Sequence, residues 1–110
     1  MFCASIVYPT GLDRFDADYF GARHIPRFVS FLGENCVRYE VHRPLKQPGA
    51  PDPPFAAAAY VWVHSAEEFG AVIAKHGEEI YADIERFSSG QPIRAWSLVL
   101  DPVSEDPATR

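Results

Sequence analysis

Two histidines in this chain fall among apolar neighbours, where a titratable side chain can do chemistry. His24 lies in F-D-A-D-Y-F-G-A-R-H-I-P, residues 15–26, and His76 lies in a helical pattern at 65–84. An imidazole titrates near pH 6.5, so it can take up or release a proton at working pH. We therefore expect His24 to be an acid–base group in an enclosed site. The alternative is a structural histidine that bonds a carbonyl freed by a kink at Pro26.

Two acidic residues can interact with the second histidine's helix face. Asp83 falls seven residues after His76 on the same apolar stripe, about 10 Å along a helix, which is too far for direct contact. Glu79, three residues after His76, can reach it. Polar groups on a core-facing stripe must find hydrogen-bond partners or line a wet cavity. For His76 and Asp83 we favour a hydrogen-bonded packing role, with a place in the site as the alternative.

Aromatic residues on the predicted strands are the other candidates. Such residues are usually core, but the alanines at 56–59 leave room beside the large rings for a pocket. In an enzyme, His24 would move a proton while Tyr39 or Tyr60 orients an oxygen atom of the ligand. The candidate site residues are His24 and Tyr39 for catalysis, and Tyr8, Phe28, Tyr60, Trp62, His76 and Asp83 for substrate binding.

Size and charge exclude several classes of protein. The 110 residues suit one domain, which we place at 1–100, with a flexible tail at 101–110. A net charge of −5 disfavours nucleic acid and anionic membranes as partners. No apolar run reaches the roughly 18 residues of a spanning helix, and the N-terminus lacks a signal-peptide pattern, so we expect a cytoplasmic protein.

Cysteine and histidine spacing gives no sign of a metal site. Cys3 and Cys36 lie in apolar, strand-like surroundings, where two buried thiols are expected in a reducing compartment. The chain contains neither C-x-x-C nor H-E-x-x-H, so we expect no bound metal.

Periodicity and turn chemistry predict four strands and two helices. Asp16 suits the N-cap of the first helix, and Gly33 suits its end. Ser65 and Glu68 form a capping box, which makes the alanine-rich segment before them a strand and not a helix. The prolines at 44–54 exclude regular structure and predict a long loop, tolerant of shortening, that could act as a lid. The predicted strands are 2–8, 36–43, 55–63 and 92–100, and the predicted helices are 16–32 and 65–87.

The order β-α-β-β-α-β predicts an α+β, ferredoxin-like fold, with a four-stranded antiparallel sheet and both helices on one face. The first, third and fourth strands carry apolar residues on both sides, whereas two helices cover one side only. The open side must therefore meet another apolar surface. We expect a homodimer that packs sheet against sheet into a barrel.

Several short motifs together resemble the EthD family, named for ethyl tert-butyl ether degradation. They span most of the chain in order. The matching segments are Tyr8-Pro9, F-D-x-D-Y-F at 15–20, H-x-P at 24–26, Pro53-Pro54 before Phe55, S-x-E-x-F at 65–69, H-x-x-E-I-x-x-D-I at 76–84, and Pro92. The segment R-Y-E-V at 38–41 is similar to a muconolactone isomerase relative, in which a tyrosine there and a histidine at the place of His24 line the site.

The resemblance implies a dimeric α+β barrel that works without a metal or organic cofactor. Family members are often labelled reductases, yet this chain has no G-x-G-x-x-G nicotinamide fingerprint. Related barrels include monooxygenases, lactone isomerases and polyketide cyclases. The resemblance thus implies an isomerase, cyclase or oxidoreductase that acts on a small hydrophobic carbonyl or hydroxy compound. The alternative is a non-catalytic small-molecule-binding or accessory protein that uses the same cavity.

Overall fold

A computed structural model describes residues 1–100 of the chain, so the predicted tail at 101–110 lies outside the described residues. The four strands are β1 (Phe2–Pro9), β2 (Cys36–His42), β3 (Phe55–Val63) and β4 (Ile93–Leu98). The helical segments are α1 (Ala17–Tyr19), the π-helical turn η1 (Phe20–His24), α2 (Ile25–Leu32), the 3₁₀ turn η2 (Gly33–Asn35) and α3 (Ala66–Ile84). The predicted β-α-β-β-α-β order is confirmed, since α1, η1 and α2 form one interrupted helix.

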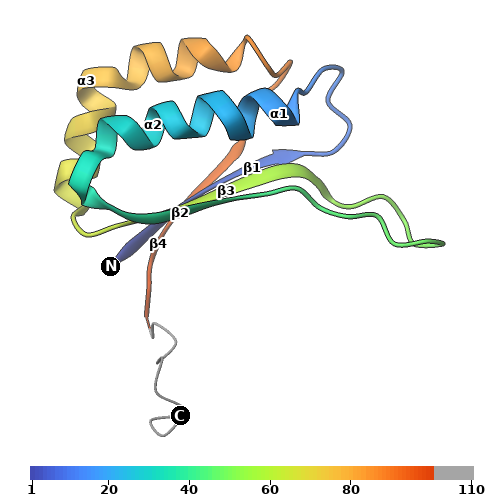
Figure 1. Ribbon diagram of the computed structural model, residues 1–110, viewed down its shortest axis with the longest axis horizontal. Helices are drawn as coiled ribbons and strands as arrows, with labels where there is room; N and C mark the ends of the chain where they lie inside the picture. Colours follow the sequence, from blue (N-terminus) through green and yellow to red (C-terminus); the bar gives the residue numbers. More distant parts are fainter. Residues whose placement is uncertain (101–110) are drawn as a thin grey trace, which may run out of the picture.

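The strands form one antiparallel sheet in the order β2-β3-β1-β4, and the helices cover a single face of it (Figure 1). This is the ferredoxin-like α+β arrangement. The two middle strands, β3 and β1, are each hydrogen-bonded on both sides, and β2 and β4 are the edges. Because β4 pairs with β1, segments far apart in the sequence lie next to each other.

The predicted helix starts are confirmed by their caps. The Asp16 carboxylate accepts a hydrogen bond from the Tyr19 amide, and the Ser65 hydroxyl accepts one from the Glu68 amide. The second helix ends at Ile84, three residues before the predicted end at 87. The chain turns away there, and the Phe87 carbonyl accepts a hydrogen bond from the Asp16 amide at 2.7 Å. That bond ties the end of α3 to the start of the first helix.

The core lies between the helices and one face of the sheet. Alternate residues of β3, namely Ala57, Ala59, Val61 and Val63, are almost fully buried there. They belong to two clusters. One contains Tyr8, Phe20, Ile25, Ile84 and Phe87 with Ala57 and Ala59. The other contains Ala4, Phe28, Leu32 and Ile80 with Val61 and Val63.

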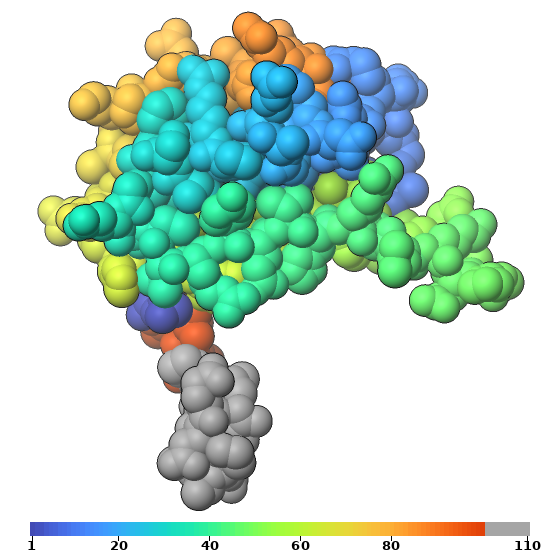
Figure 2. Space-filling view, viewed as in Figure 1, coloured from blue at the N-terminus to red at the C-terminus, as the bar shows by residue number. Residues whose placement is uncertain are grey.

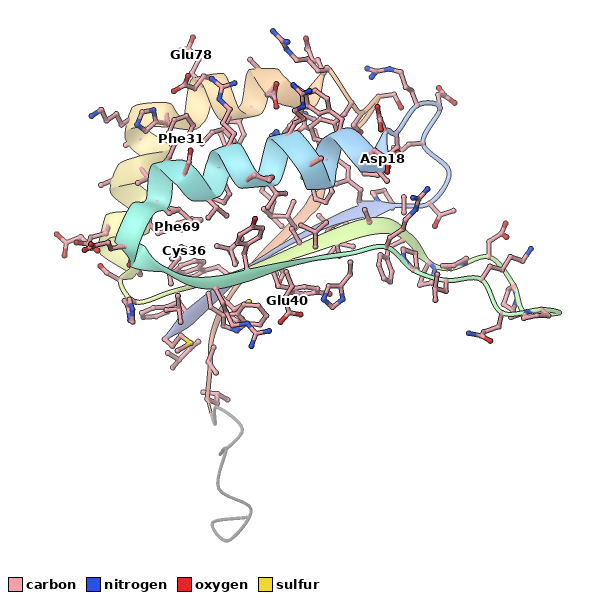
Figure 3. The ribbon with its side chains drawn as sticks, viewed as in Figure 1. Asp18, Phe31, Cys36, Glu40, Phe69 and Glu78 are labelled. Atoms are coloured by element: carbon pink, nitrogen blue, oxygen red, sulfur yellow. The ribbon has the colours of Figure 1, made fainter. Side chains whose placement is uncertain are left out.

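The opposite face of the sheet carries no helix. Figure 3 shows Glu40 on this side, pointing away from the helices. Trp62 and Tyr60 lie in contact on the same face, with Arg38 over the Trp62 ring and His42 against Tyr60. The sheet therefore has a covered face and an open face, and both carry large apolar side chains.

The proline-rich segment at 44–54 forms no helix or strand, as predicted, and projects from the body of the molecule between β2 and β3 (Figures 1 and 2). Lys46 and Asp52 pair across it at 3.1 Å on exposed side chains, an interaction that contributes little stability. The segment extends past the ends of the helices (Figure 1).

Candidate active site

An irregular turn in the first helix positions His24. In η1 the Ile25 amide donates to the Phe20 carbonyl, five residues earlier, in place of the usual four. Pro26 follows at the start of α2 and has no N–H, so it cannot donate to the Ala22 carbonyl. The sequence predicts a kink here, and the structure resolves it as a single widened turn that ends at His24.

Asp83, from the last turn of α3, holds the histidine ring. His24 Nδ1 and Asp83 Oδ2 are 2.8 Å apart. The Tyr19 hydroxyl donates to Asp83 Oδ1 at 2.9 Å, and Arg86 Nε lies 3.5 Å from the same oxygen. His24 and Asp83 are each only 6% exposed. When Nδ1–H donates to the carboxylate, the ring keeps the tautomer whose Nε2 lone pair is available.

At neutral pH, His24 is uncharged and Asp83 is ionised, because both pKa values are lowered. Burial lowers the pKa of His24, although Asp83 acts in the other direction, so the imidazole is neutral. Burial raises the pKa of Asp83, but the hydrogen bonds from His24 and Tyr19 outweigh this and hold it below its usual range. A neutral imidazole beside an ionised carboxylate is the form required of a general base.

His24 lies on the wall of a cavity of about 460 Å³, a size typical of small-molecule sites. The cavity is bounded by β1 and β4 of the sheet and by the helices α2 and α3. Its wall is mainly apolar and aromatic. The lining residues include Ala4, Ile6, Phe28, Phe69, Ile73, Ile80, Ile84 and Trp96, with Ser5, Tyr8, His24, Tyr81 and Arg94 as the polar ones.

Two further polar side chains lie on this wall. Tyr8 is fully buried, and its hydroxyl is the one buried side-chain polar atom without a hydrogen-bond partner among residues 1–100. Arg94 stands with its guanidinium 5.1 Å from the centre of the Tyr81 ring and donates to Gln91 Oε1 at 3.2 Å. The site thus combines one base with two hydrogen-bond donors. Within the described part of the chain, no cluster of side chains could hold a metal ion.

Comparison with solved structures identifies the family. A crystal structure of an EthD-like protein from Ralstonia eutropha JMP134 has 33% sequence identity and a TM-score of 0.81, covering 97% of this chain and 96% of that one. This chain belongs to the EthD-like family. A second EthD family protein, from Bacillus halodurans C-125, has the same fold at 12% identity, with a TM-score of 0.68 and coverage of 91% and 99%.

The fold of this EthD-like protein also occurs in an oxygenase. SnoaB, a cofactor-independent oxygenase from Streptomyces nogalater, was solved as a point mutant and has 13% identity, a TM-score of 0.62 and coverage of 94% and 95%. A scan against protein-family models and a search of curated proteins find no match.

Within residues 1–100, no helix is long and apolar enough to cross a membrane.

In the structure of this chain, four of the residues predicted from sequence lie together. His24, Tyr8 and Phe28 line the cavity, and Asp83 lies behind His24 and binds its ring. Phe28 follows His24 by one helical turn, so both point from the same helix toward the sheet. The sequence predicted that Asp83 would have a hydrogen-bond partner, and that partner is His24.

The other four predicted residues lie elsewhere. Tyr39 is on the edge strand β2 and is 41% exposed, two strands away from β1 and roughly 10 Å from the cavity wall. Tyr60 and Trp62 are on the open face of the sheet. His76 stacks on Phe31 at 4.1 Å between ring centroids and bonds Glu79 at 2.7 Å on the outer side of α3.

The loop at 44–54 does not cover this cavity. None of its residues lines the wall, because the loop joins β2 to β3 while the cavity lies over β1 and β4. The lid role that the sequence left open for this loop therefore has no support in the lining of the cavity. Strand order decides the matter, since it places the loop at one edge of the sheet and the cavity toward the other.

Tyr19 and Arg94 were not among the site residues predicted from sequence. Tyr19 lies in the D-Y-F motif, five residues before His24, a spacing that a widened π turn places on one side of the helix. Arg94 is the one charge in an otherwise apolar strand segment, and that contrast was the available signal. Phe69 and Trp96, whose rings lie 4.7 Å apart on the wall, carried no signal beyond apolar periodicity.

Proposed function

We propose that this EthD-like protein is a cofactor-independent enzyme in which His24 removes a proton from a small hydrophobic carbonyl or hydroxy compound. One observation carries the proposal: a buried histidine on an apolar cavity wall has its Nδ1 held by a buried carboxylate at 2.8 Å. Its Nε2 makes no hydrogen bond with any of residues 1–100. A base in this state is ready to accept a proton from a ligand.

The proposed step is a single proton transfer. The ligand's C–H or O–H bond breaks, its electron pair stays on the ligand, and the proton bonds to His24 Nε2. Asp83 remains ionised and stabilises the imidazolium through its short hydrogen bond, while Tyr19 keeps the carboxylate oriented. A positioned base of this kind contributes about 10²–10⁴-fold in rate.

Two observations support a small-molecule enzyme. SnoaB, which shares the fold, is a cofactor-independent oxygenase, so this architecture is compatible with chemistry that needs no bound cofactor. The apolar, aromatic lining of the cavity favours a hydrophobic ligand. A shared fold does not fix the reaction, and the proposal therefore rests on the site geometry.

We further propose that the protein acts as a homodimer. The open face of the sheet carries Tyr60 and Trp62 with no helix over them. Apolar surface of this kind is normally covered, and a second copy of the same face covers both at once through a two-fold axis. The helix-covered cavity lies on the other side of the sheet, so each subunit retains its own site.

Hydrogen–deuterium exchange tests the proposed proton transfer directly. Indanone and tetralone are small, apolar ketones with acidic C–H bonds next to the carbonyl. In D₂O, wild-type protein should accelerate loss of the proton signal at that carbon, followed by proton NMR. His24→Asn should lose the acceleration, and Asp83→Asn should reduce it because the base is no longer held or stabilised.

The control is His76→Asn, which removes a histidine that also stacks on an aromatic ring but lies outside the cavity, and it should leave exchange unchanged. If the ketones bind, as seen by quenching of tryptophan fluorescence, yet the wild type accelerates no exchange, the protein is a binding or accessory protein and the enzymatic proposal is wrong.

A further inference from the structure

The polar groups on the cavity wall include one positive charge and no negative charge, and more hydrogen-bond donors than strong acceptors. Arg94 is the one permanently charged side chain among the described lining residues, and no aspartate, glutamate or lysine joins it. The tyrosine hydroxyls of Tyr8 and Tyr81 are donors when a ligand brings an acceptor. The single strong acceptor is His24, through Nε2. An occupant of this cavity therefore meets one base and several donors.

Arg94 is an exposed residue of β4 that forms no ion pair within residues 1–100. In the strand register it lies opposite Ile6, on the side of the sheet that faces the helices. Its polar contacts are with the neutral Gln91 side chain and the face of the Tyr81 ring, and no carboxylate within residues 1–100 forms an ion pair with it. Arg94 lines the cavity and is also exposed to solvent, so its guanidinium is accessible, and an anion that reaches it can accept charge-assisted hydrogen bonds.

Tyr8 gives an independent indication of a missing acceptor. Its ring contacts the rings of Phe15, Phe20 and Phe87, the residue lines the cavity, and its hydroxyl has no partner among residues 1–100. A buried hydroxyl left without a hydrogen bond is unfavourable, because it has lost its water partners and gained none in the protein. An oxygen atom on a ligand in the cavity would satisfy it.

The charge of Arg94 acts on both of the other groups. It opposes the burial effect that raises the pKa of Tyr8, and it adds to the burial effect that lowers the pKa of His24. Base, donor and cation therefore belong to one electrostatic environment. Negative charge that develops on a ligand at this place would be stabilised by both Arg94 and Tyr8.

On the basis of the proposed function, we infer that the ligand is an aromatic oxygen acid, a phenol or an enol, bound as its oxyanion by Tyr8 and Arg94. His24 Nε2 takes the proton from the ligand's O–H, the electron pair remains on oxygen, and the Tyr8 hydroxyl donates to that oxygen. The rings of Phe28, Phe69 and Trp96 surround the hydrocarbon part of the molecule. Neutral aromatic hydrocarbons should bind less well.

Para-nitrophenol is a direct probe, because its anion absorbs visible light and its neutral form does not. Titrating protein into the probe, at a pH where most of it is neutral, should raise the anion absorbance. We expect wild-type protein to prefer the anion over the neutral form by about tenfold, equivalent to lowering the probe's apparent pKa by about one unit. Nitrobenzene, which has no acidic proton, should bind more weakly.

Three variants test the assigned residues. Arg94→Gln and Tyr8→Phe should each lose most of the preference for the anion, whereas Arg94→Lys should retain part of it because the charge remains. The matched control is Arg38→Gln. Arg38 lies 5.0 Å over the Trp62 ring on the open face, so this change removes the same charge and a similar aromatic contact away from the cavity. It should behave as wild type.

The outcomes separate this inference from the proposed function. Equal anion preference in wild type, Arg94→Gln and Tyr8→Phe would overturn the oxyanion assignment, even where His24→Asn abolishes ketone exchange. Loss of the preference in both variants supports the assignment, even where the wild type catalyses no exchange. Failure of both para-nitrophenol and nitrobenzene to bind at millimolar concentration would overturn the ligand class altogether.

Discussion

Replacing Tyr8 by phenylalanine should stabilise the ligand-free protein. The Tyr8 side chain is fully buried, and its hydroxyl lacks a hydrogen-bond partner. Removing that oxygen ends a desolvation penalty of about 1–3 kcal/mol and leaves the ring contacts with Phe15, Phe20 and Phe87 in place. For a domain of this size, each kcal/mol corresponds to a rise in Tm on the order of 4–8 °C.

The assay compares three Tyr→Phe variants by urea denaturation and calorimetry. Tyr8→Phe should raise the free energy of unfolding. Tyr19→Phe should lower it, because that hydroxyl donates to the Asp83 carboxylate at 2.9 Å. Tyr81→Phe should change it by less than about 0.5 kcal/mol, since the Tyr81 side chain is exposed and the substitution is at the surface. All three are measured at one protein concentration, so that association does not shift the midpoints.

A destabilised Tyr8→Phe variant would refute the reasoning. A loss of about 1 kcal/mol or more would mean that the hydroxyl already has a satisfied hydrogen bond in the ligand-free protein. The Tyr8 hydroxyl would then not be free to donate a hydrogen bond to a ligand. A gain in stability together with weaker para-nitrophenolate binding would show that the Tyr8 hydroxyl binds the ligand and destabilises the ligand-free protein.

Three further outcomes are expected. Burial lowers the pKa of His24 in the folded protein, so the free energy of unfolding should fall as pH drops below about 6.5, because the unfolded chain binds the proton first; the His24→Asn variant should lack this pH dependence. Deleting residues 47–51 should leave both Tm and para-nitrophenol binding almost unchanged, and a large loss of either would contradict the loop's peripheral place. Light scattering should give about twice 12.3 kDa, and Trp62→Lys, on the open face, should give the monomer mass; a monomeric wild type would rule out the dimer.

Local sequence determined most of the secondary structure. Asp16 and Ser65 have side chains that accept amide hydrogen bonds at helix starts, and these caps form as predicted. Pro26 lacks a backbone N–H in any conformation, so its residue type alone predicted an irregular helix near His24. The β-α-β-β-α-β order then left the ferredoxin-like sheet as the expected arrangement. The caps and the kink each depend on residues within about one helical turn of each other.

Tertiary structure decided which candidates share a site. His24 and Asp83 are 59 residues apart in sequence and meet because the two helices pack side by side on the sheet. Period-two alternation separates Val61 from Tyr60 and Trp62, but both sets are apolar, so only helix packing decides which set faces the core. Pairing of β4 with β1 brings Arg94 beside the cavity and leaves Tyr39 at the far edge. These are long-range contacts, and no local pattern of residues specifies them.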